Sequence, residues 1–221
     1  MEALTDTVLT GIPLFADLGK EDAAVISRHA VTKSYPKNTV ILSEGDATDS
    51  LYIILSGRIK VYVSDEDGKE IILNDQGPGE YFGEMALLDE GPRSASVMTL
   101  EPTRLAVLSK QTFRDCLASN PRISFNLIRQ LVHRGRRLTD NVKNLGLNDV
   151  YGRLTYKLRE LATSRDGELV IDQKLTHQDI ASMVGSSREM VSRIMKELSR
   201  GGYISITEKR ITIKRDLPSA W

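Results

Sequence analysis

The hydrophobic period of the chain changes at Pro121. Beyond it, apolar or small residues recur at alternating spacings of three and four, at Ile128, Leu131, Gly135, Leu138, Val142 and Leu145. This heptad pattern predicts one helix from Arg122 to Leu145, with Pro121 near its first turn. At 1.5 Å per residue the helix would span about 36 Å. A helix of this length, with only a narrow apolar stripe, is too long to pack along one small domain. The pattern favours a parallel dimer interface over an amphipathic helix that packs only on its own domain.

The part of the chain before this helix is rich in short strands. Between residues 38 and 108, apolar and β-branched runs alternate with turn signals such as Glu44-Gly45-Asp46 and Ser56-Gly57-Arg58. The predicted strands are Thr39–Leu42, Leu51–Leu55, Ile59–Val63, Ile71–Leu73, Ser94–Thr99 and Arg104–Leu108. Short helices are expected over residues 13–30 and 111–118. Many short strands with regular turns are typical of a sandwich or jelly-roll barrel.

The part after the long helix has the pattern of a helix-turn-helix. Gly146 is predicted to end the long helix, and Asn148 or Asp149 to cap the next one. Further on, the Thr-x-x-Asp sequence at Thr176 resembles a capping box, and Gly185 supplies a turn with positive φ. A second helix would run from Arg188 to Arg200, capped by Ser187. The inner positions of the two helices are Ile180, Ala181, Val184, Val191, Ile194 and Leu198.

The outer face of the second helix carries groups suited to a major groove. Its members are Arg188, Glu189, Ser192, Arg193 and Lys196. An arginine can donate two hydrogen bonds to guanine, and a carboxylate can accept one from cytosine. The alternative is a solvated charged helix face, which the surrounding helix-turn-helix pattern disfavours. A hairpin from Ile204–Thr207 and Ile211–Lys214 would form a wing, with Lys209 and Arg210 at its tip near backbone phosphate.

The charge of the chain is distributed unevenly. The 30 basic and 30 acidic residues balance, but residues 1–120 hold 11 basic and 19 acidic side chains, a balance of −8. Residues 121–147 carry +5 and residues 148–221 carry +3. Such asymmetry is expected when only one part of a chain meets a polyanion.

The stretch from Gly79 to Ser96 contains a candidate anion site. Gly83 is expected to open a short helical turn, whose N–H groups can bind an anion. Arg93 lies in a region predicted to face a barrel interior, where a guanidinium needs an anionic partner. A phosphate would meet that need with two hydrogen bonds, and Glu84 could accept one from a ribose hydroxyl. The alternative is an internal Glu84–Arg93 ion pair without a ligand.

Two of these motifs carry a family resemblance. Phe82–Ser96 resembles the phosphate-binding cassette of cyclic-nucleotide-binding domains, and Ser187–Arg193 resembles the recognition helix of the CRP/FNR bacterial regulators. Over residues 10–215 the chain is similar to that family. The resemblance implies an α+β fold with a jelly-roll nucleotide-binding domain (1–120), a dimerisation helix (121–147) and a winged helix-turn-helix domain (148–221). It implies a DNA-binding homodimer that is controlled by cyclic AMP and binds a palindromic operator with TGTGA-like half-sites.

The resemblance also assigns roles to particular residues. In the barrel, Arg93 and Ser94 would bind the cyclic phosphate, Glu84 the ribose 2′-hydroxyl, and the backbone at Gly83 and Met85 would assist. On the long helix, the ligand-binding positions would be Arg134, Leu138 and Thr139. Arg188, Glu189 and Arg193 would read bases, and Gln178 would hold phosphate. The remaining DNA-binding candidates are His177, Ser187, Ser192, Lys196, Lys209 and Arg210.

One departure from the family leaves the ligand open. The cyclic-AMP receptor of this family has a threonine–serine pair where this chain has Leu138 and Thr139. Thr139 can still donate and accept a hydrogen bond to a base, whereas Leu138 cannot. Cyclic AMP is the first candidate effector. Cyclic GMP, cyclic di-GMP, haem and activity without a ligand are the alternatives.

Other classes of protein fit the sequence poorly. The three histidines, His29, His133 and His177, are not paired at metal-ligand spacing, and no catalytic triad is evident, so we expect neither an enzyme nor a metal site. The single cysteine, Cys116, excludes an intramolecular disulfide and a cysteine-ligated cluster, and is expected to pack in a helix. No signal peptide and no run of 18 apolar residues is present, so we expect a cytoplasmic protein without a membrane partner. RNA polymerase is a further candidate partner, although nothing in the sequence marks a surface for it.

Overall fold

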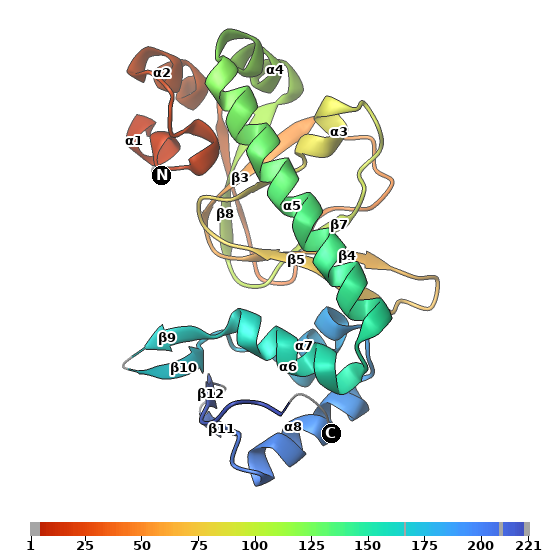
Figure 1. The fold of residues 1–221 in the computed structure, drawn as a ribbon. Coiled ribbons are helices and arrows are strands. Elements are labelled where there is room, and N and C mark those ends of the chain that lie inside the picture. Colours follow the sequence, from red (N-terminus) through yellow and green to blue (C-terminus); the bar gives the residue numbers. More distant parts are fainter. Residues whose placement is uncertain (1–4, 166, 208–209, 219–221) are drawn as a thin grey trace. The chain divides into compact units, whose positions relative to one another are not determined.

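The computed structural model describes residues 5–165, 167–207 and 210–218. The chain divides into two compact units. The first comprises Met1–Val63 and Ile72–Arg136, and the second comprises Ser64–Ile71 and Arg137–Trp221. The division falls inside the long helix α5 (Pro121–Leu147), which is continuous (Figure 1).

The first unit contains two four-stranded antiparallel sheets, which confirms the predicted jelly-roll architecture within an α+β fold. One sheet has the strand order β1-β8-β3-β6 and the other β2-β7-β4-β5. The strands are β1 (Val31–Tyr35), β2 (Val40–Leu42), β3 (Ser50–Ser56), β4 (Ile59–Ser64), β5 (Glu70–Gln76), β6 (Tyr81–Phe82), β7 (Ser96–Thr99) and β8 (Thr103–Ser109). Strands β1 and β6 were not predicted from the sequence.

Strand β7 begins at Ser96, two residues later than predicted. The reason lies in the backbone of Arg93, whose N–H donates to Asp46 O at 2.9 Å and whose carbonyl accepts from Gly45 N–H at 2.8 Å. The segment before β7 is therefore tied to the turn after β2 rather than to a ladder.

The helices of the first unit lie outside the sheets. They are α1 (Asp6–Thr10), the 3-10 turn η1 (Pro13–Phe15), α2 (Lys20–His29), α3 (Glu84–Leu88) and α4 (Lys110–Ser119). The short helices predicted over residues 13–30 are η1 and α2, which are separate because Gly19, with extended backbone, forms the N-cap of α2. Helix α4 agrees with the prediction to within one residue, and Ser109 caps it by accepting from the N–H of Thr112.

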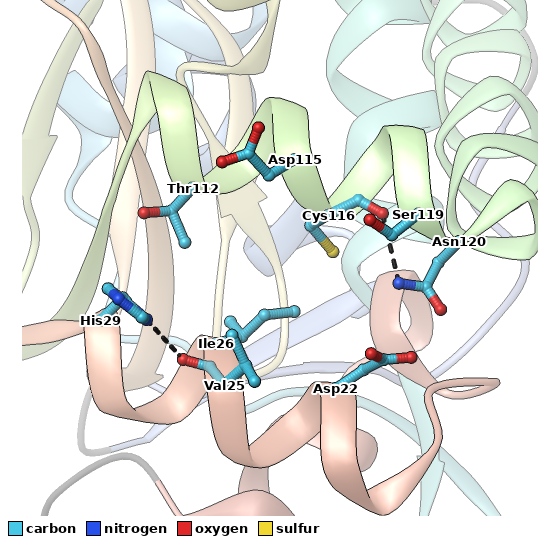
Figure 2. A pocket seen from close by; sticks show the side chains of 9 residues that line it. All are labelled: Asp22, Val25, Ile26, His29, Thr112, Asp115, Cys116, Ser119 and Asn120. Atoms are coloured by element: carbon cyan, nitrogen blue, oxygen red, sulfur yellow. Dashed lines mark hydrogen bonds between the residues drawn. The ribbon is translucent and has the colours of Figure 1, made fainter.

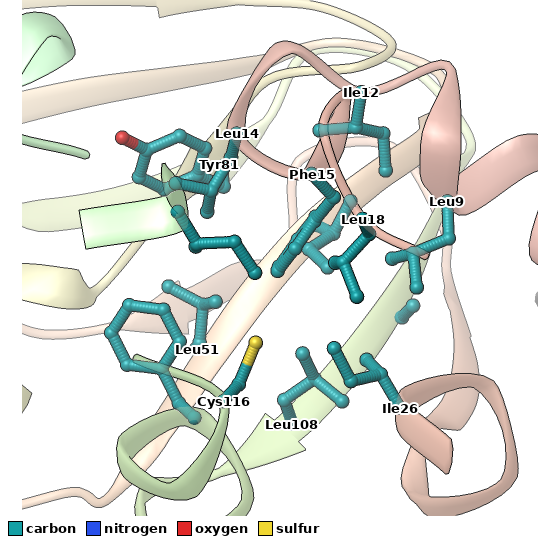
Figure 3. Packing of buried hydrophobic residues seen from close by; sticks show 14 of the residues in the cluster. Leu9, Ile12, Leu14, Phe15, Leu18, Ile26, Leu51, Tyr81, Leu108 and Cys116 are labelled. Atoms are coloured by element: carbon teal, nitrogen blue, oxygen red, sulfur yellow. The ribbon is translucent and has the colours of Figure 1, made fainter. Parts of the chain in front are cut away.

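The main core of the first unit lies between the N-terminal helices, the sheet and α4. Leu9, Leu14 and Phe15 pack with Leu51 and Leu108 from the strands (Figure 3). Cys116 of α4 belongs to the same cluster and is buried. Burial raises the pKa of its thiol to about 12, which fits the predicted packing role.

Helix α5 differs from its prediction in two respects. Gly146 does not end it, since the helix continues to Leu147 and Gly146 has no positive φ. Leu131, which the heptad pattern places in the seam, is partly buried and packs on the core of its own unit. The large apolar side chains that α5 leaves exposed are Phe125, Ile128, Val132, Leu138, Val142, Leu145 and Leu147.

The second unit packs three helices against a small antiparallel sheet. The helices are α6 (Val150–Leu161), α7 (His177–Val184) and α8 (Arg188–Arg200). The sheet has the order β11-β12-β10-β9, formed by β9 (Thr163–Arg165), β10 (Glu168–Ile171), β11 (Ile204–Thr207) and β12 (Arg210–Ile213). The predicted wing is confirmed as β11 and β12, although β12 begins and ends one residue earlier. The hairpin of β9 and β10 was not predicted.

No helix in the described ranges is long and apolar enough to cross a membrane.

Candidate functional site

Arg93 lies just before β7 and is 3% exposed. Its guanidinium donates to three neutral oxygens: Nε to Thr48 Oγ1 at 2.6 Å, Nη1 to the Gly83 carbonyl at 2.5 Å and Nη2 to the Ser50 carbonyl at 2.8 Å. Within the described ranges no carboxylate forms an ion pair with it. Burial lowers the pKa of Arg93, because the charged form loses hydration. Three of its five N–H groups are used, so it holds a positive charge and two donors for an anion.

Glu84 begins α3 directly after Gly83, which has the left-handed φ of 87°. Its side chain is 1% exposed. One carboxylate oxygen accepts from Arg134, and the other, Oε2, has no hydrogen-bond partner in the described part of the chain. Burial raises the pKa of Glu84, and the Arg134 charge opposes that rise most strongly. The ionic partner of Glu84 is thus Arg134 of α5, and the Glu84–Arg93 ion pair that was the alternative to a ligand is not formed.

Arg134 connects the cassette to α5. Besides Glu84, it donates through Nη2 to the Tyr81 carbonyl at 2.7 Å, and its guanidinium lies 5.0 Å from the centre of the Tyr81 ring. Tyr81 is buried and its hydroxyl has no partner among the described residues. No sequence pattern indicates a role for Tyr81, Thr48 or Ser50, because two of the three act through backbone carbonyls.

The remaining cassette residues are open to ligand. Ser94 and Met85 are exposed, and among the described residues the Ser94 hydroxyl makes only a 3.7 Å contact with Met85 Sδ. A Cβ at Gly83 would lie 2.6 Å from Arg93 Nη1 and 3.0 Å from the Ser50 carbonyl, so only glycine fits there. The structure therefore brings Gly83, Glu84, Arg93 and Arg134 together. Leu138 and Thr139 lie farther along α5 in the second unit.

The helix-turn-helix of the second unit is built as the sequence predicts. Thr176 and Asp179 form the capping box of α7, and Gly185 ends that helix with φ 62°. Ser187 caps α8 by accepting from the N–H of Met190. Arg153 of α6 was not predicted to take part: it donates to the carbonyls of Val184 at 2.7 Å and Gly185 at 3.3 Å, which fixes the turn.

Helix α8 separates its buried and charged faces clearly. Val191, Ile194, Met195 and Leu198 are buried in the core of the second unit. Of the predicted DNA-binding side chains on α8, Arg188, Glu189, Arg193 and Lys196 are exposed and Ser192 is half-buried. Arg193 Nη2 lies 2.8 Å from Met190 Sδ, a weak acceptor that a stronger one can replace.

The outer DNA-binding candidates occupy different environments. Gln178 is exposed and His177 half-buried at the start of α7. Arg210, predicted to lie at the wing tip, begins β12 and forms an ion pair with Asp172 at 2.8 Å. Lys209 lies outside the described residues.

A pocket of about 150 Å³ lies between α2 and α4 of the first unit (Figure 2). Val25, Ile26 and Cys116 give it an apolar side, and Asp22 and Asp115 an acidic one. None of the predicted ligand-binding residues lines it. In the described ranges no group of three or more histidine, cysteine or carboxylate side chains is placed to hold a metal ion.

Comparisons with known proteins agree with this geometry. Residues 32–120 match the family model of the cyclic nucleotide-binding domain, and residues 152–216 match that of the Crp-like helix-turn-helix domain. The chain is 32% identical over 212 residues to the CRP-like cAMP-activated global transcriptional regulator of Mycobacterium tuberculosis, covering 94% of this chain and 95% of that protein. It is 37% identical over 192 residues to the cAMP-activated global transcriptional regulator CRP of Pasteurella multocida, covering 84% and 90%.

A solved structure is similar in fold. The c-di-GMP responsive global regulator CLP of Xanthomonas campestris superposes with a TM-score of 0.77 at 25% identity, covering 88% of this chain and 99% of that one. Both domain matches and the near full-length relatives point to one conclusion. The chain is a DNA-binding transcription regulator, not an enzyme, and it belongs to the CRP/FNR family.

Proposed function

We propose that the chain is a cytoplasmic, homodimeric regulator whose operator binding is switched on by a cyclic nucleotide, with cyclic AMP as the first candidate. Residues 1–120 would sense the nucleotide, residues 121–147 would pair the protomers and residues 148–221 would bind DNA. RNA polymerase is a candidate partner of the DNA-bound dimer.

The observation that carries this proposal is the buried charge of Arg93. Burying a charge is costly unless an opposite charge accompanies it, and the three hydrogen-bond acceptors of Arg93 are all neutral. The carboxylates of Asp49, Glu84 and Asp46 act on its charge without forming an ion pair with it. A cyclic phosphate would supply the opposite charge and accept the two unused donors, while the exposed Ser94 hydroxyl would add a third contact. The unpartnered Oε2 of buried Glu84 supports the same ligand, because a ribose hydroxyl would satisfy it.

Control of DNA binding would pass through Arg134. A nucleotide that contacts Glu84 must share it with Arg134, the α5 residue that holds it in this structure. Ligand binding would in this way bias the position of α5, by as much as the ligand's affinities for the two positions differ. The exposed apolar residues of α5 would form the dimer seam, including Phe125 and Val132 in place of Leu131.

In the dimer, each α8 would enter a major groove of a palindromic operator with TGTGA-like half-sites. Their separation would be one DNA turn, about 34 Å. Arg188, Glu189 and Arg193 would read base edges, and Ser187, Ser192, Lys196, His177 and Gln178 would contact the operator around them.

A second ligand is worth a parallel test, because Leu138 cannot hydrogen-bond to a base. The c-di-GMP responsive regulator of similar fold makes cyclic di-GMP the specific alternative.

The deciding experiment is calorimetric titration with cyclic AMP, cyclic GMP and cyclic di-GMP, followed by operator binding with each nucleotide. We expect cyclic AMP to bind at micromolar concentration and to strengthen operator binding. Absence of cyclic AMP binding at millimolar concentration would refute that assignment. Binding of cyclic di-GMP alone would transfer the proposal to the second ligand.

A further inference from the structure

One face of the small sheet in the second unit carries a ladder of charges. Strands β10 and β12 pair antiparallel with Ile171 opposite Ile211 and Leu169 opposite Ile213. The same register places Asp172 beside Arg210 and Glu168 beside Lys214. Because side chains alternate along a strand, these charged residues lie on the face opposite the buried isoleucines.

The acidic residues of this ladder form ion pairs with the basic ones. Asp172 Oδ1 lies 2.8 Å from Arg210 Nε, and Asp172 Oδ2 lies 3.1 Å from Arg165 Nη2 of β9. Glu168 Oε1 lies 2.6 Å from Lys214 Nζ. One carboxylate, Asp172, therefore bridges two arginines, one on each neighbouring strand.

The carboxylate of Asp172 contacts the two arginines much as a bound phosphate would. A carboxylate whose two oxygens each meet one guanidinium offers the arginines the same charge-assisted hydrogen bonds that a DNA phosphate would. Arg210 is the first residue of β12, the second strand of the wing, which we expect to meet the DNA backbone. We propose that Asp172 is an intramolecular competitor for DNA phosphate, which occupies Arg210 and Arg165 and so limits the backbone affinity of the wing. The inference rests on the proposed role of the second unit in DNA binding.

The energetics make such competition effective. These ion pairs are partly exposed, with Asp172 40% and Arg210 47% accessible, and exposed pairs of this kind are weak. DNA phosphate can therefore displace Asp172, but at the cost of leaving its carboxylate unpaired beside a polyanion. Phosphate contacts carry no sequence information, so Asp172 should reduce affinity for operator and non-specific DNA by the same factor.

The test compares Asp172→Asn with the wild-type protein on operator and on non-specific duplex, over a range of salt concentrations. The variant keeps the shape of the side chain and removes its charge. Glu160→Gln is the matched control, since it removes one exposed acidic charge of α6 that pairs only with Lys157 within the described residues. We expect Asp172→Asn to strengthen binding to both duplexes by on the order of tenfold at low salt. The slope of log K against log salt should steepen by about 0.9 for each additional phosphate that the variant neutralises.

A double variant keeps the test sharp. Adding Arg210→Ala to Asp172→Asn should reverse most of the increase in affinity, because Arg210 is the side chain that Asp172→Asn releases for phosphate. If Asp172→Asn changes neither affinity nor slope while its melting temperature is unchanged, Asp172 only braces the sheet and the inference is wrong. If Asp172→Asn melts earlier than the wild type, the two proteins are compared at a temperature at which both are folded. Weaker binding by the variant there, or an increase in affinity that persists in the double variant, also contradicts the inference. A wild-type protein that binds neither duplex would contradict the proposed function itself.

Discussion

The nucleotide cassette and the recognition helix use charged side chains in opposite ways. In the cassette, Arg93 and Glu84 are almost fully buried, and their side-chain hydrogen bonds reach residues 10 to 50 positions away in the sequence. On α8, Arg188, Glu189 and Arg193 are exposed and depend on a regular helix whose other face is buried. The properties of the cassette thus depend on the burial of its charges, whereas those of the recognition helix depend on the regular spacing of its exposed side chains.

This difference determines how each site should respond to change. A buried charge is held by several partners, so removing one group affects the others and the ligand together. An exposed side chain that reads a base acts almost alone. Its removal should therefore weaken binding only to DNA that carries that base. Substitutions at each site test this contrast, and we expect the largest effects in the cassette.

The largest effect should come from Arg93→Ala. Truncating one member of a buried charge pair costs about 2–5 kcal/mol, so nucleotide affinity should fall on the order of a hundredfold or more. Calorimetry with cyclic AMP measures the loss, and Arg28→Ala on the exposed face of α2 is the control. Arg93→Ala also leaves the carbonyls of Gly83 and Ser50 without a donor. Arg93→Lys is therefore a second variant, which keeps the positive charge but loses the paired donors of the guanidinium. Unchanged affinity in both variants would refute the pocket.

Gly83→Ala should affect the same site by steric hindrance, without removing any polar group. Its Cβ would lie 2.6 Å from Arg93 Nη1 in a left-handed backbone, so Arg93 must move or the turn must change. The left-handed conformation costs a non-glycine residue roughly 1–2 kcal/mol, and displacement of Arg93 adds to it. We expect nucleotide affinity to fall by about a hundredfold. A variant that binds as the wild type does would show that the position of Arg93 is not what the ligand requires.

Arg193→Ala tests the exposed site. Loss of a base contact costs about 1–3 kcal/mol on the operator and little on non-specific DNA. Fluorescence anisotropy with both duplexes in saturating nucleotide measures the two affinities. Since the hydrogen bond of Arg193 in the described ranges is a weak one to the Met190 sulfur, stability should not change. An equal loss on both duplexes would assign Arg193 to phosphate rather than to a base.

The same contrast explains which features the sequence revealed. Helix α8 was predicted to the residue, because its caps and its apolar period are local signals that tertiary packing did not override. The cassette was recognised by its motif, but the partners of Arg93 and Glu84 were not. Thr48 and Ser50 lie more than 40 residues from Arg93, and two of its three acceptors are backbone carbonyls that no side-chain pattern can indicate.

Helix α5 shows how an apolar period can mislead. Leu131 fits the heptad, yet it packs on the core of the first unit, and Val132 beside it is left 49% exposed. A helix that contacts both its own domain and a partner carries two overlapping apolar stripes, and spacing alone does not separate them.

Substitutions at these neighbours separate the two stripes. If the chain dimerises as proposed, Val132→Asp should raise the dimer dissociation constant about tenfold or more, because it places a charge in the proposed seam while leaving the core intact. Leu131→Asp should instead lower the melting temperature of the first unit. Sedimentation equilibrium and thermal melting distinguish them. If Leu131→Asp weakened the dimer and Val132→Asp lowered the melting temperature, Leu131 would belong to the seam and the exposed face of α5 would not be the interface.

The smallest effect should come from Gly185→Ala, the counterpart of Gly83→Ala in the DNA-binding unit. Both glycines have positive φ, but a Cβ at Gly185 would meet only the flexible Leu145 Cδ2, at 3.1 Å, and no functional group. The expected cost is therefore the backbone strain alone, about 1 kcal/mol of unfolding free energy measured in urea, and Gly185→Asn should recover part of it. Operator affinity should stay near that of the wild type. A loss of operator affinity as large as the loss of nucleotide binding in Gly83→Ala would mean that the recognition helix is as sensitive to its surroundings as the buried cassette.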